Sequence, residues 1–137
     1  MIIVDTNIIA YLYISGERSL QVEQLLSIDA NWNAPVLWRS EFRSVLSRYL
    51  RNKILSLDET LLIFQRAEQL LSNNEYEIST VHVMQLVHSS NCSSYDCEFV
   101  ALAQYLSAPL ITADKKILRQ FPGIAKSPEN YLRSIPA

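Results

Sequence analysis

The chain has 137 residues, of which 49% are hydrophobic and 19% are charged, and its formal net charge at pH 7 is −2. This composition excludes an intrinsically disordered chain and predicts one globular domain, residues 1–137. No apolar run reaches the roughly 18–20 residues of a membrane-spanning helix. The first residues lack the basic and then apolar pattern of a secretory signal, so we expect a cytoplasmic protein without a membrane partner.

Glycine and cysteine usage excludes two kinds of site. The two glycines, Gly16 and Gly123, are too few for a P-loop or a GxGxxG dinucleotide turn. The two cysteines, Cys92 and Cys97, form neither a CxxC pair nor a disulfide framework. We therefore expect neither a nucleotide-binding glycine loop nor a redox site.

Short apolar segments and amphipathic helices alternate along the chain. The apolar segments do not alternate strictly with polar residues, which is typical of strands in a parallel sheet covered on both faces. Ser56 and Glu59 match a capping box at the start of one helix. The predicted strands are residues 2–4, 33–38, 75–80 and 109–114, and the predicted helices are one containing Ile8, Ile9 and Leu12 and those at residues 19–29, 38–53, 56–71, 80–90 and 93–106. The fold class is therefore α/β.

The first and last of these strands both end on a carboxylate. Asp5 directly follows the apolar run Ile2 to Val4, and Asp114 closes the segment LITAD. An Asp between a strand and a helix is a good N-cap, because its oxygen accepts an orphan backbone N–H. Carboxylates at strand ends also mark the ligand crevice of an open α/β sheet. For Asp5, both interpretations stay open at this point.

Two further acids lie on apolar helix faces. Glu41 takes the i+3 position of the apolar stripe that begins at Trp38, although the edge of such a stripe also lets a side chain reach water. Asp96 leads the stripe of a later helix, although an Asp in a first turn is also favoured by the helix dipole. Ser93 or Ser94 is available to cap that helix, which leaves Asp96 free for another role.

The four acids are expected to converge. The carboxyl ends of parallel strands share one edge, and the helices that follow those strands begin there. Asp5 and Asp114 would come from strand tips, and Glu41 and Asp96 from first helical turns. Clustered carboxylates repel one another unless a cation lies among them, and oxygen ligands suit Mg²⁺ or Mn²⁺. Because such an ion can activate water against a phosphodiester, the pattern predicts metal-dependent hydrolysis.

Four segments resemble, in order and spacing, the motifs of PIN-domain ribonucleases, most closely the VapC-type toxins of bacterial toxin–antitoxin pairs. They are VDTNIIAYL, SEFRSVLSRYLR, SSYDCEFVALAQYL and LITADKKILRQFPGI, and the likeness continues through KSPENYL. The resemblance implies a Rossmann-like three-layer α/β/α sandwich with a mostly parallel central sheet. It also implies Mg²⁺- or Mn²⁺-dependent endoribonuclease activity, a homodimer, and a small antitoxin protein that blocks the site.

The resemblance also implies roles residue by residue. Asp5 is similar to the metal ligand that follows the first strand, and Asp96 to the ligand at a helix entry. Glu41 and Asp114 complete the implied set of catalytic and metal-binding acids. Further polar side chains would orient these carboxylates, namely Thr6, Asn7 and Thr112. The RNA target does not follow from the resemblance, because members of the family cut different RNAs.

An acidic protein that cleaves RNA needs positive charge near its site. Eight of the twelve Lys and Arg residues lie in two stretches that each contain one of the four acids. Arg39 and Arg43 flank Glu41, and Lys115 and Lys116 directly follow the last acid. We expect these four basic side chains to contact RNA phosphates. The other basic residues of the helix that carries Glu41 are equally well explained as solvated surface.

The helix at residues 56–71 has more apolar residues than one buried stripe needs. The surplus favours contact with a second copy of the chain or with an antitoxin helix.

Two other functions fit parts of the pattern. A haloacid-dehalogenase-like phosphatase also begins with an Asp at a strand tip, but that chemistry uses a second Asp two residues later, where this chain has Asn7. A non-catalytic α/β binding or regulatory module would use the acids as caps and surface charges. Such a module has no reason to be stabilised by Mn²⁺, which separates it from an enzyme.

Overall fold

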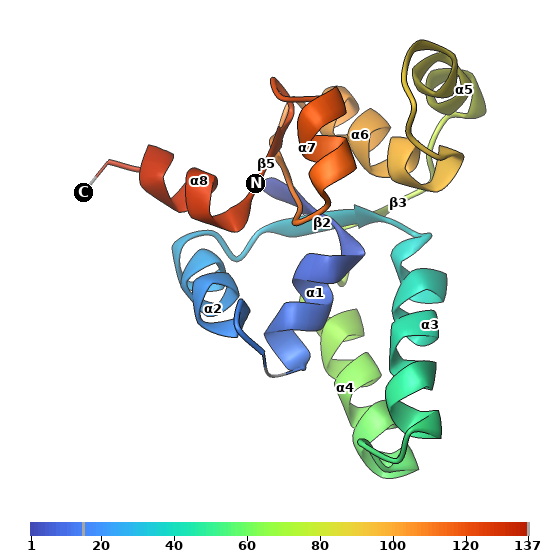
Figure 1. Ribbon diagram of the computed structural model, residues 1–137, viewed down its shortest axis with the longest axis vertical. Helices are drawn as coiled ribbons and strands as arrows, with labels where there is room; N and C mark the ends of the chain where they lie inside the picture. Colours follow the sequence, from blue (N-terminus) through green and yellow to red (C-terminus); the bar gives the residue numbers. More distant parts are fainter. Residues whose placement is uncertain (15, 137) are drawn as a thin grey trace.

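The computed structural model describes residues 1–14 and 16–136, and in these residues the strands form one five-stranded sheet in the order β3-β2-β1-β4-β5 (Figure 1). Every neighbouring pair is parallel. The strands are β1 (Ile2–Val4), β2 (Trp32–Pro35), β3 (Glu75–Tyr76), β4 (Leu110–Ile111) and β5 (Ala125–Lys126). The predicted α/β sandwich is therefore confirmed, with an all-parallel sheet.

Helices cover both faces of this sheet. The helices of the described residues are α1 (Thr6–Tyr13), α2 (Ser19–Ile28), α3 (Trp38–Arg51), α4 (Leu57–Leu70), α5 (Thr80–Ser89), α6 (Ser94–Leu106), α7 (Lys115–Gln120) and α8 (Pro128–Ser134). Figure 1 shows α1 to α4 on one side of the sheet and α5 to α7 on the other. This follows from right-handed crossovers, because the chain proceeds from β1 to β3 in one direction and then returns to β4 and β5. None of these helices has the length and apolar character to cross a membrane.

The buried apolar faces predicted from periodicity form the core. All three residues of β1 are fully buried, as expected for a strand covered on both faces. On the α3 side, the Phe64 ring stacks on Trp38 and Phe42 at centroid distances of 5.4 and 6.0 Å, and Trp38 and Phe42 pack against each other at 6.1 Å. Burying an aromatic or branched aliphatic side chain stabilises a fold by about 1.5–3 kcal/mol. This packing fixes the position of α3 relative to the sheet.

The predicted elements differ from the structure in several details, and the strand predicted at residues 109–114 is paired only over Leu110–Ile111. The strand predicted at residues 75–80 has only two paired residues, because its partner β2 ends at Pro35 and Ser79 already caps α5. Residues 36–37 follow β2 as a turn and not as strand, and Trp38 begins α3. The predicted capping box of α4 is confirmed, since Ser56 and Glu59 exchange both hydrogen bonds.

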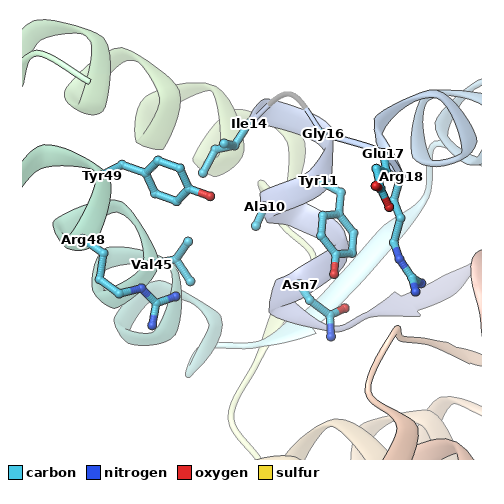
Figure 2. Close-up of a pocket in the computed structure, with 10 residues that line it drawn as sticks. All are labelled: Asn7, Ala10, Tyr11, Ile14, Gly16, Glu17, Arg18, Val45, Arg48 and Tyr49. Carbon is cyan, nitrogen blue, oxygen red and sulfur yellow. The ribbon is translucent and has the colours of Figure 1, made fainter. Parts of the chain in front are cut away.

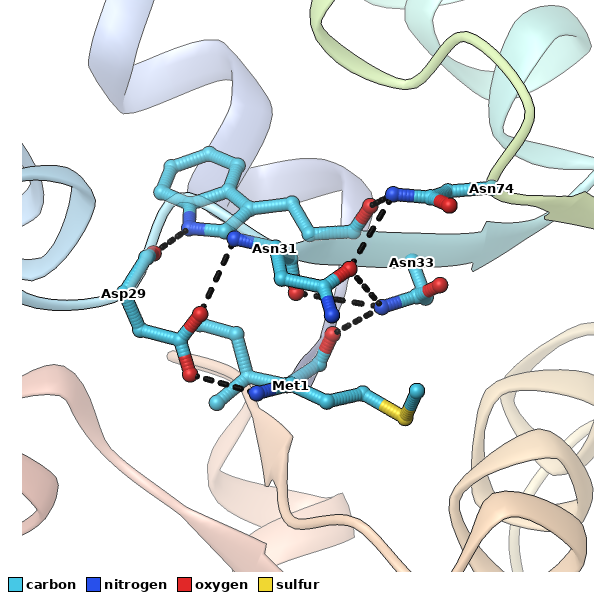
Figure 3. A network of polar contacts seen from close by, with 7 residues as sticks. Met1, Asp29, Asn31, Asn33 and Asn74 are labelled. Carbon is cyan, nitrogen blue, oxygen red and sulfur yellow. Dashed lines mark hydrogen bonds and ion pairs between the residues drawn. The ribbon is translucent and has the colours of Figure 1, made fainter.

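The two edges of the sheet have different polar residues. At the amino ends of the strands, Asp29 accepts hydrogen bonds from the amino group of Met1, at 2.7 Å, and from the backbone N–H of Asn31, at 2.9 Å (Figure 3). Asn74 and Asn33 each donate to the side-chain oxygen of Asn31 at 3.2 Å. We call Asp29, Asn31, Asn33 and Asn74 the amide edge. Here the side-chain amides of Asn33 and Asn74 donate to carbonyl oxygens, and the carboxylate of Asp29 accepts from an amino group and a backbone N–H.

The carboxyl ends of the strands form the opposite edge. β1 lies between β2 and β4, and the chain leaves the carboxyl ends of β1 and β4 on opposite faces of the sheet. In open α/β sheets, ligands bind in the crevice at such a switch point. This edge is where the sequence predicts the functional site.

Candidate active site

The four predicted acids line one cavity at this edge. Asp5, Glu41, Asp96 and Asp114 surround a space of about 310 Å³, together with Thr6, Asn7, Ser44 and Val45. Asp5 follows β1, Glu41 and Asp96 lie in the first turns of α3 and α6, and Asp114 precedes α7. We call these four side chains the acid cluster and the space the acid cavity. The topology brings together residues that are up to 109 positions apart because strand ends and helix starts share this edge.

Asp5 is the most buried member of the acid cluster. Its side chain caps α1 by accepting a hydrogen bond from the backbone N–H of Thr6 at 2.8 Å, and its other oxygen accepts one from the Thr112 hydroxyl at 2.7 Å. The pKa of Asp5 is raised to about 7, mainly by burial and to a smaller extent by the charges of Glu41 and Asp96, against the effect of these two hydrogen bonds. Asp5 is therefore both a helix cap and a carboxyl group that is destabilised in its charged form.

Glu41 and Asp96 are half-buried, and their surroundings also disfavour the charged form of each carboxyl group. Burial raises the pKa of Glu41, with a smaller contribution from the charge of Asp96, although the Thr6 hydroxyl donates to Glu41 at 2.7 Å. Burial and then the charge of Asp114 raise the pKa of Asp96. Ser93 caps α6, so Asp96 is not needed for that purpose. The carboxylates thus influence one another across the cavity.

Asp114 caps the short helix α7. Its Oδ1 accepts hydrogen bonds from the backbone N–H groups of Lys116, at 2.8 Å, and Ile117, at 3.0 Å. The backbone N–H of Asp114 in turn donates to the Thr112 hydroxyl at 3.0 Å. Like Asp5, Asp114 combines a capping role with a place on the cavity wall, so the two interpretations of these acids are compatible.

Thr6, Asn7 and Thr112 contact the carboxylates, at the positions where the resemblance places orienting side chains. The amide nitrogen of Asn7 lies 3.5 Å from Asp5 Oδ2 and 3.4 Å from the Thr112 hydroxyl oxygen. The amide oxygen of Asn7 accepts from the backbone N–H of Ala113 at 3.3 Å. These contacts tie the loop after β4 to the start of α1 and restrict the orientation of Asp5.

The side chains that line the acid cavity offer a metal ion only oxygen atoms as ligands. Within the described residues, no three Asp, Glu, His or Cys side chains lie close enough to one another to form a ready-made metal site. The carboxylates face the cavity without forming a tight cage, which fits a hydrated Mg²⁺ or Mn²⁺ ion, because such ions keep several waters and use one or two carboxylates. The raised pKa of Asp5 fits as well, since nearby positive charge would favour its charged form.

The predicted RNA-binding side chains have different surroundings in the structure. Arg39 donates from Nε and Nη2 to both carboxylate oxygens of Glu75, at 2.6 and 3.0 Å, and from Nη1 to Glu68 at 2.7 Å. Because each side-chain nitrogen of Arg39 already donates to a carboxylate, these ion pairs compete with the predicted phosphate contact, which stays a prediction. Arg43 is exposed, with its guanidinium 5.8 Å from the centroid of the Phe64 ring, and its role stays a prediction.

The two predicted lysines are exposed at the start of α7. Lys116 acts on the acid cluster, since its charge lowers the pKa of Asp96. Contact of Lys115 or Lys116 with RNA stays a prediction.

The sequence analysis missed a second cleft beside the acid cavity. It has a volume of about 420 Å³ and shares Asn7 and Val45 with the acid cavity. Its further lining is Ala10, Tyr11, Ile14, Gly16, Glu17, Arg18, Arg48 and Tyr49 (Figure 2). We call it the side cleft. Its residues come from α1, the loop before α2, and α3, and periodicity within one helix does not reveal such a combination.

The family of the chain follows from a direct match. The sequence pattern of the PIN domain matches residues 2–123, which include all four acids. The chain belongs to the PIN domain family. The fold predicted from the resemblance is therefore the fold of this family, with the acid cluster at its switch point.

Individual relatives agree with this PIN domain assignment. The chain is 26% identical over 126 residues to the Ribonuclease VapC3 of Pyrobaculum aerophilum, a match that covers 90% of this chain and 96% of that protein. The structure is similar to one titled a toxin–antitoxin complex from Klebsiella pneumoniae, with a TM-score of 0.65, 22% identity, and coverage of 93% of this chain and 98% of the other. It is also similar to FitAcB from Neisseria gonorrhoeae, with a TM-score of 0.72, 17% identity, and coverage of 94% and 99%.

Proposed function

We propose that residues 1–137 form a single catalytic PIN domain that hydrolyses RNA phosphodiester bonds with Mg²⁺ or Mn²⁺. One observation carries the proposal: four carboxylates from separate elements line one cavity at the switch point of the sheet, and burial raises the pKa of Asp5 to about 7. The relative from Pyrobaculum aerophilum, which is named a ribonuclease, supports RNA as the substrate. Family membership disfavours the haloacid-dehalogenase-like phosphatase.

In this proposal the acid cluster holds the ion and polar neighbours hold the acids. When bound, the divalent ion would supply Lewis acidity and activate water for attack on the phosphodiester. Thr112 and the N–H of Thr6 fix the two oxygens of Asp5, and the Thr6 hydroxyl fixes Glu41. Lys116, whose charge already acts on Asp96, offsets part of the negative charge of the site. These contacts preorganise the acids and reduce the rearrangement that binding requires.

The proposal is tested by the ends of the cleaved RNA. Hydrolysis by activated water does not use the ribose 2′-hydroxyl, so the products should carry 5′-phosphate and 3′-hydroxyl ends. Cleavage should require Mg²⁺ or Mn²⁺ and stop with EDTA. The assay uses single-stranded and structured RNA, followed by end-group analysis with a phosphatase and a ligase. Cyclic-phosphate ends, or cleavage that continues in EDTA, would contradict the mechanism.

We further propose that the protein acts in the cytoplasm as the toxin of a toxin–antitoxin pair and as a homodimer. The similar structure from Klebsiella pneumoniae, titled a toxin–antitoxin complex, supports an antitoxin partner. On α4, Leu57, Leu61 and Leu62 are exposed by 58%, 59% and 46%, so the apolar surplus predicted for this helix lies on the surface. These leucines would contact a second copy or an antitoxin helix. A monomer in sedimentation at tens of micromolar would contradict the dimer.

A further inference from the structure

The side cleft combines aromatic rings with guanidinium groups directly beside the acid cavity. In Figure 2, Arg48 and Tyr49 lie on one side of the cleft and Tyr11 and Arg18 on the other. Asn7, which lies below Tyr11 in this view, also lines the acid cavity. The Arg18 guanidinium carbon lies 5.8 Å from the centroid of the Tyr11 ring. Two cations and two aromatic rings therefore line one concave surface.

The segment that carries Arg18 is fixed by local hydrogen bonds. The Ser19 hydroxyl donates to the backbone oxygen of Tyr11 at 2.8 Å and accepts from the backbone N–H of Gly16 at 3.0 Å. These bonds connect the start of α2 to the end of α1. These bonds hold the backbone next to Arg18 against the end of α1, where the Arg18 side chain reaches the Tyr11 ring.

The charge of the side cleft is opposite to that of the acid cavity. Its lining has two cations, Arg18 and Arg48, against one carboxylate, Glu17, whereas the acid cavity has four carboxylates. The carboxylates repel a polyanion whose cleaved bond lies beside them. Positive charge on the adjoining wall offsets this repulsion and so favours binding of the polyanion. The two hollows adjoin each other, since Asn7 and Val45 line both.

We propose that the side cleft binds the single-stranded RNA segment next to the cleaved bond. Arg18 and Arg48 contact its phosphates, and Tyr11 stacks on a base. Stacking platforms within a positive groove are the general way in which proteins bind single strands without strong sequence preference. An acidic peptide also suits two arginines, but unlike a nucleic acid base it does not need a flat ring to stack on. The inference rests on the proposed ribonuclease function.

Binding is measured separately from cleavage. A fluorescein-labelled 12-residue oligouridine is titrated with protein in EDTA, and anisotropy gives the affinity over a range of salt concentrations. Arg48→Ala should reduce the slope of log K against log salt by about 0.7, the value for one phosphate contact on a single strand. Arg48→Lys keeps the charge and should restore the slope. Arg51→Ala is the matched control, because Arg51 is exposed on the same helix and does not line the cleft.

The tyrosine has a different expected signature. Tyr11→Leu keeps an apolar side chain but removes the ring, and it should lower the affinity about tenfold without changing the salt slope. Thermal melts of each variant show whether it is folded as in the wild type. Salt slopes that are equal for Arg48→Ala, Arg51→Ala and wild type would overturn the proposal, as would wild-type protein that does not bind the oligouridine.

Cleavage assays separate this inference from the proposed function. If the wild type cleaves RNA with Mn²⁺ while the cleft variants bind oligouridine normally, the side-cleft proposal fails and the ribonuclease proposal stands. If the variants weaken binding while no RNA is cleaved, the cleft binds RNA and the ribonuclease proposal fails. A labelled oligoglutamate that binds more tightly than oligouridine, and loses binding in Arg48→Ala, would overturn the inference and assign the cleft to a protein partner.

Discussion

The two edges of the central sheet are both polar and hydrogen-bonded, yet only one of them gathers unneutralised negative charge. At the amide edge, Asn33 and Asn74 donate to oxygens of neighbouring residues, and Asp29 is paired with the amino group of Met1. At the other edge, hydroxyl and backbone donors contact the acid cluster. Within the described residues, the single buried side-chain N or O atom without a hydrogen-bond partner is Oε1 of Gln21, which belongs to neither edge.

The two edges therefore differ in charge and not in hydrogen bonding. The acid cavity is lined by four carboxylates and by no cationic side chain, and burial raises the pKa of Asp5, Glu41 and Asp96. Hydrogen bonds can orient such carboxylates but do not remove their mutual repulsion. The hydrogen bonds of the acid cluster are made, but its negative charge is not neutralised. A cation bound among these carboxylates would supply the missing positive charge. The amide edge shows what a purely structural polar network looks like in the same fold.

The largest effect is expected when charge is removed from the acid cluster without a change of shape. Asp96→Asn should lower RNA cleavage by at least about 100-fold, because the side chain keeps its size but no longer helps to hold a divalent ion. Multiple-turnover cleavage measured with Mn²⁺ checks this. Asp58→Asn, in the exposed first turn of α4, is the control and should retain wild-type activity. Equal activity in Asp96→Asn and wild type would remove Asp96 from the site.

The next effect concerns stability and pH without metal. The pKa of Asp5 is about 7 in the folded state and about 3.8 as its ordinary value, so the folded state holds the proton more tightly. Stability is therefore highest below about pH 4 as far as Asp5 is concerned, and this contribution is lost as pH rises through 7, by up to about 4 kcal/mol. Asp5→Asn should flatten this decline in urea unfolding measured in EDTA from pH 4 to 8. A decline as steep as that of the wild type would show that Asp5 does not cause it.

The smallest effect concerns the basic residue that the sequence analysis placed at the site. Arg39→Ala removes a two-oxygen ion pair with Glu75 and a second pair with Glu68, side chains that are less than two-fifths exposed. It should lower the free energy of unfolding by about 1–2 kcal/mol and leave RNA cleavage unchanged. The comparison variant Arg43→Ala should change stability by less than about 0.5 kcal/mol, since Arg43 is exposed. Loss of RNA binding in Arg39→Ala, with stability intact, would instead support the phosphate contact that the sequence predicts for Arg39.

The parts of the site that follow from local pattern could be predicted from the sequence. Asp5 directly follows an apolar strand and Glu41 interrupts an apolar helix stripe, and each anomaly is visible within a few residues. The structural role of Arg39 could not be predicted in this way, because its partners Glu68 and Glu75 are 29 and 36 residues away. Long-range pairing of this kind depends on how the helices pack and not on any local pattern.

Short length is the reason that the sequence analysis left out α7, β5 and the seven-residue helix α8. Helix α7 has six residues and β5 has two, which is too short for a helical or strand period to be recognised. The side cleft was missed because its cations, Arg18 and Arg48, come from elements that meet only in the folded chain. In the sequence, Arg48 is indistinguishable from a solvated surface residue.

The most direct test of the account compares one carboxylate from each edge in Mn²⁺ binding. Calorimetric titration with MnCl₂ should show binding by the wild type and by Asp29→Asn, whose side chain belongs to the amide edge. Binding should be lost or weakened at least about tenfold in Asp5→Asn, whose side chain lines the acid cavity. Mn²⁺ binding of equal strength by Asp5→Asn and wild type, or equal loss in both variants, would contradict the claim that the carboxyl edge of the sheet is a cation site.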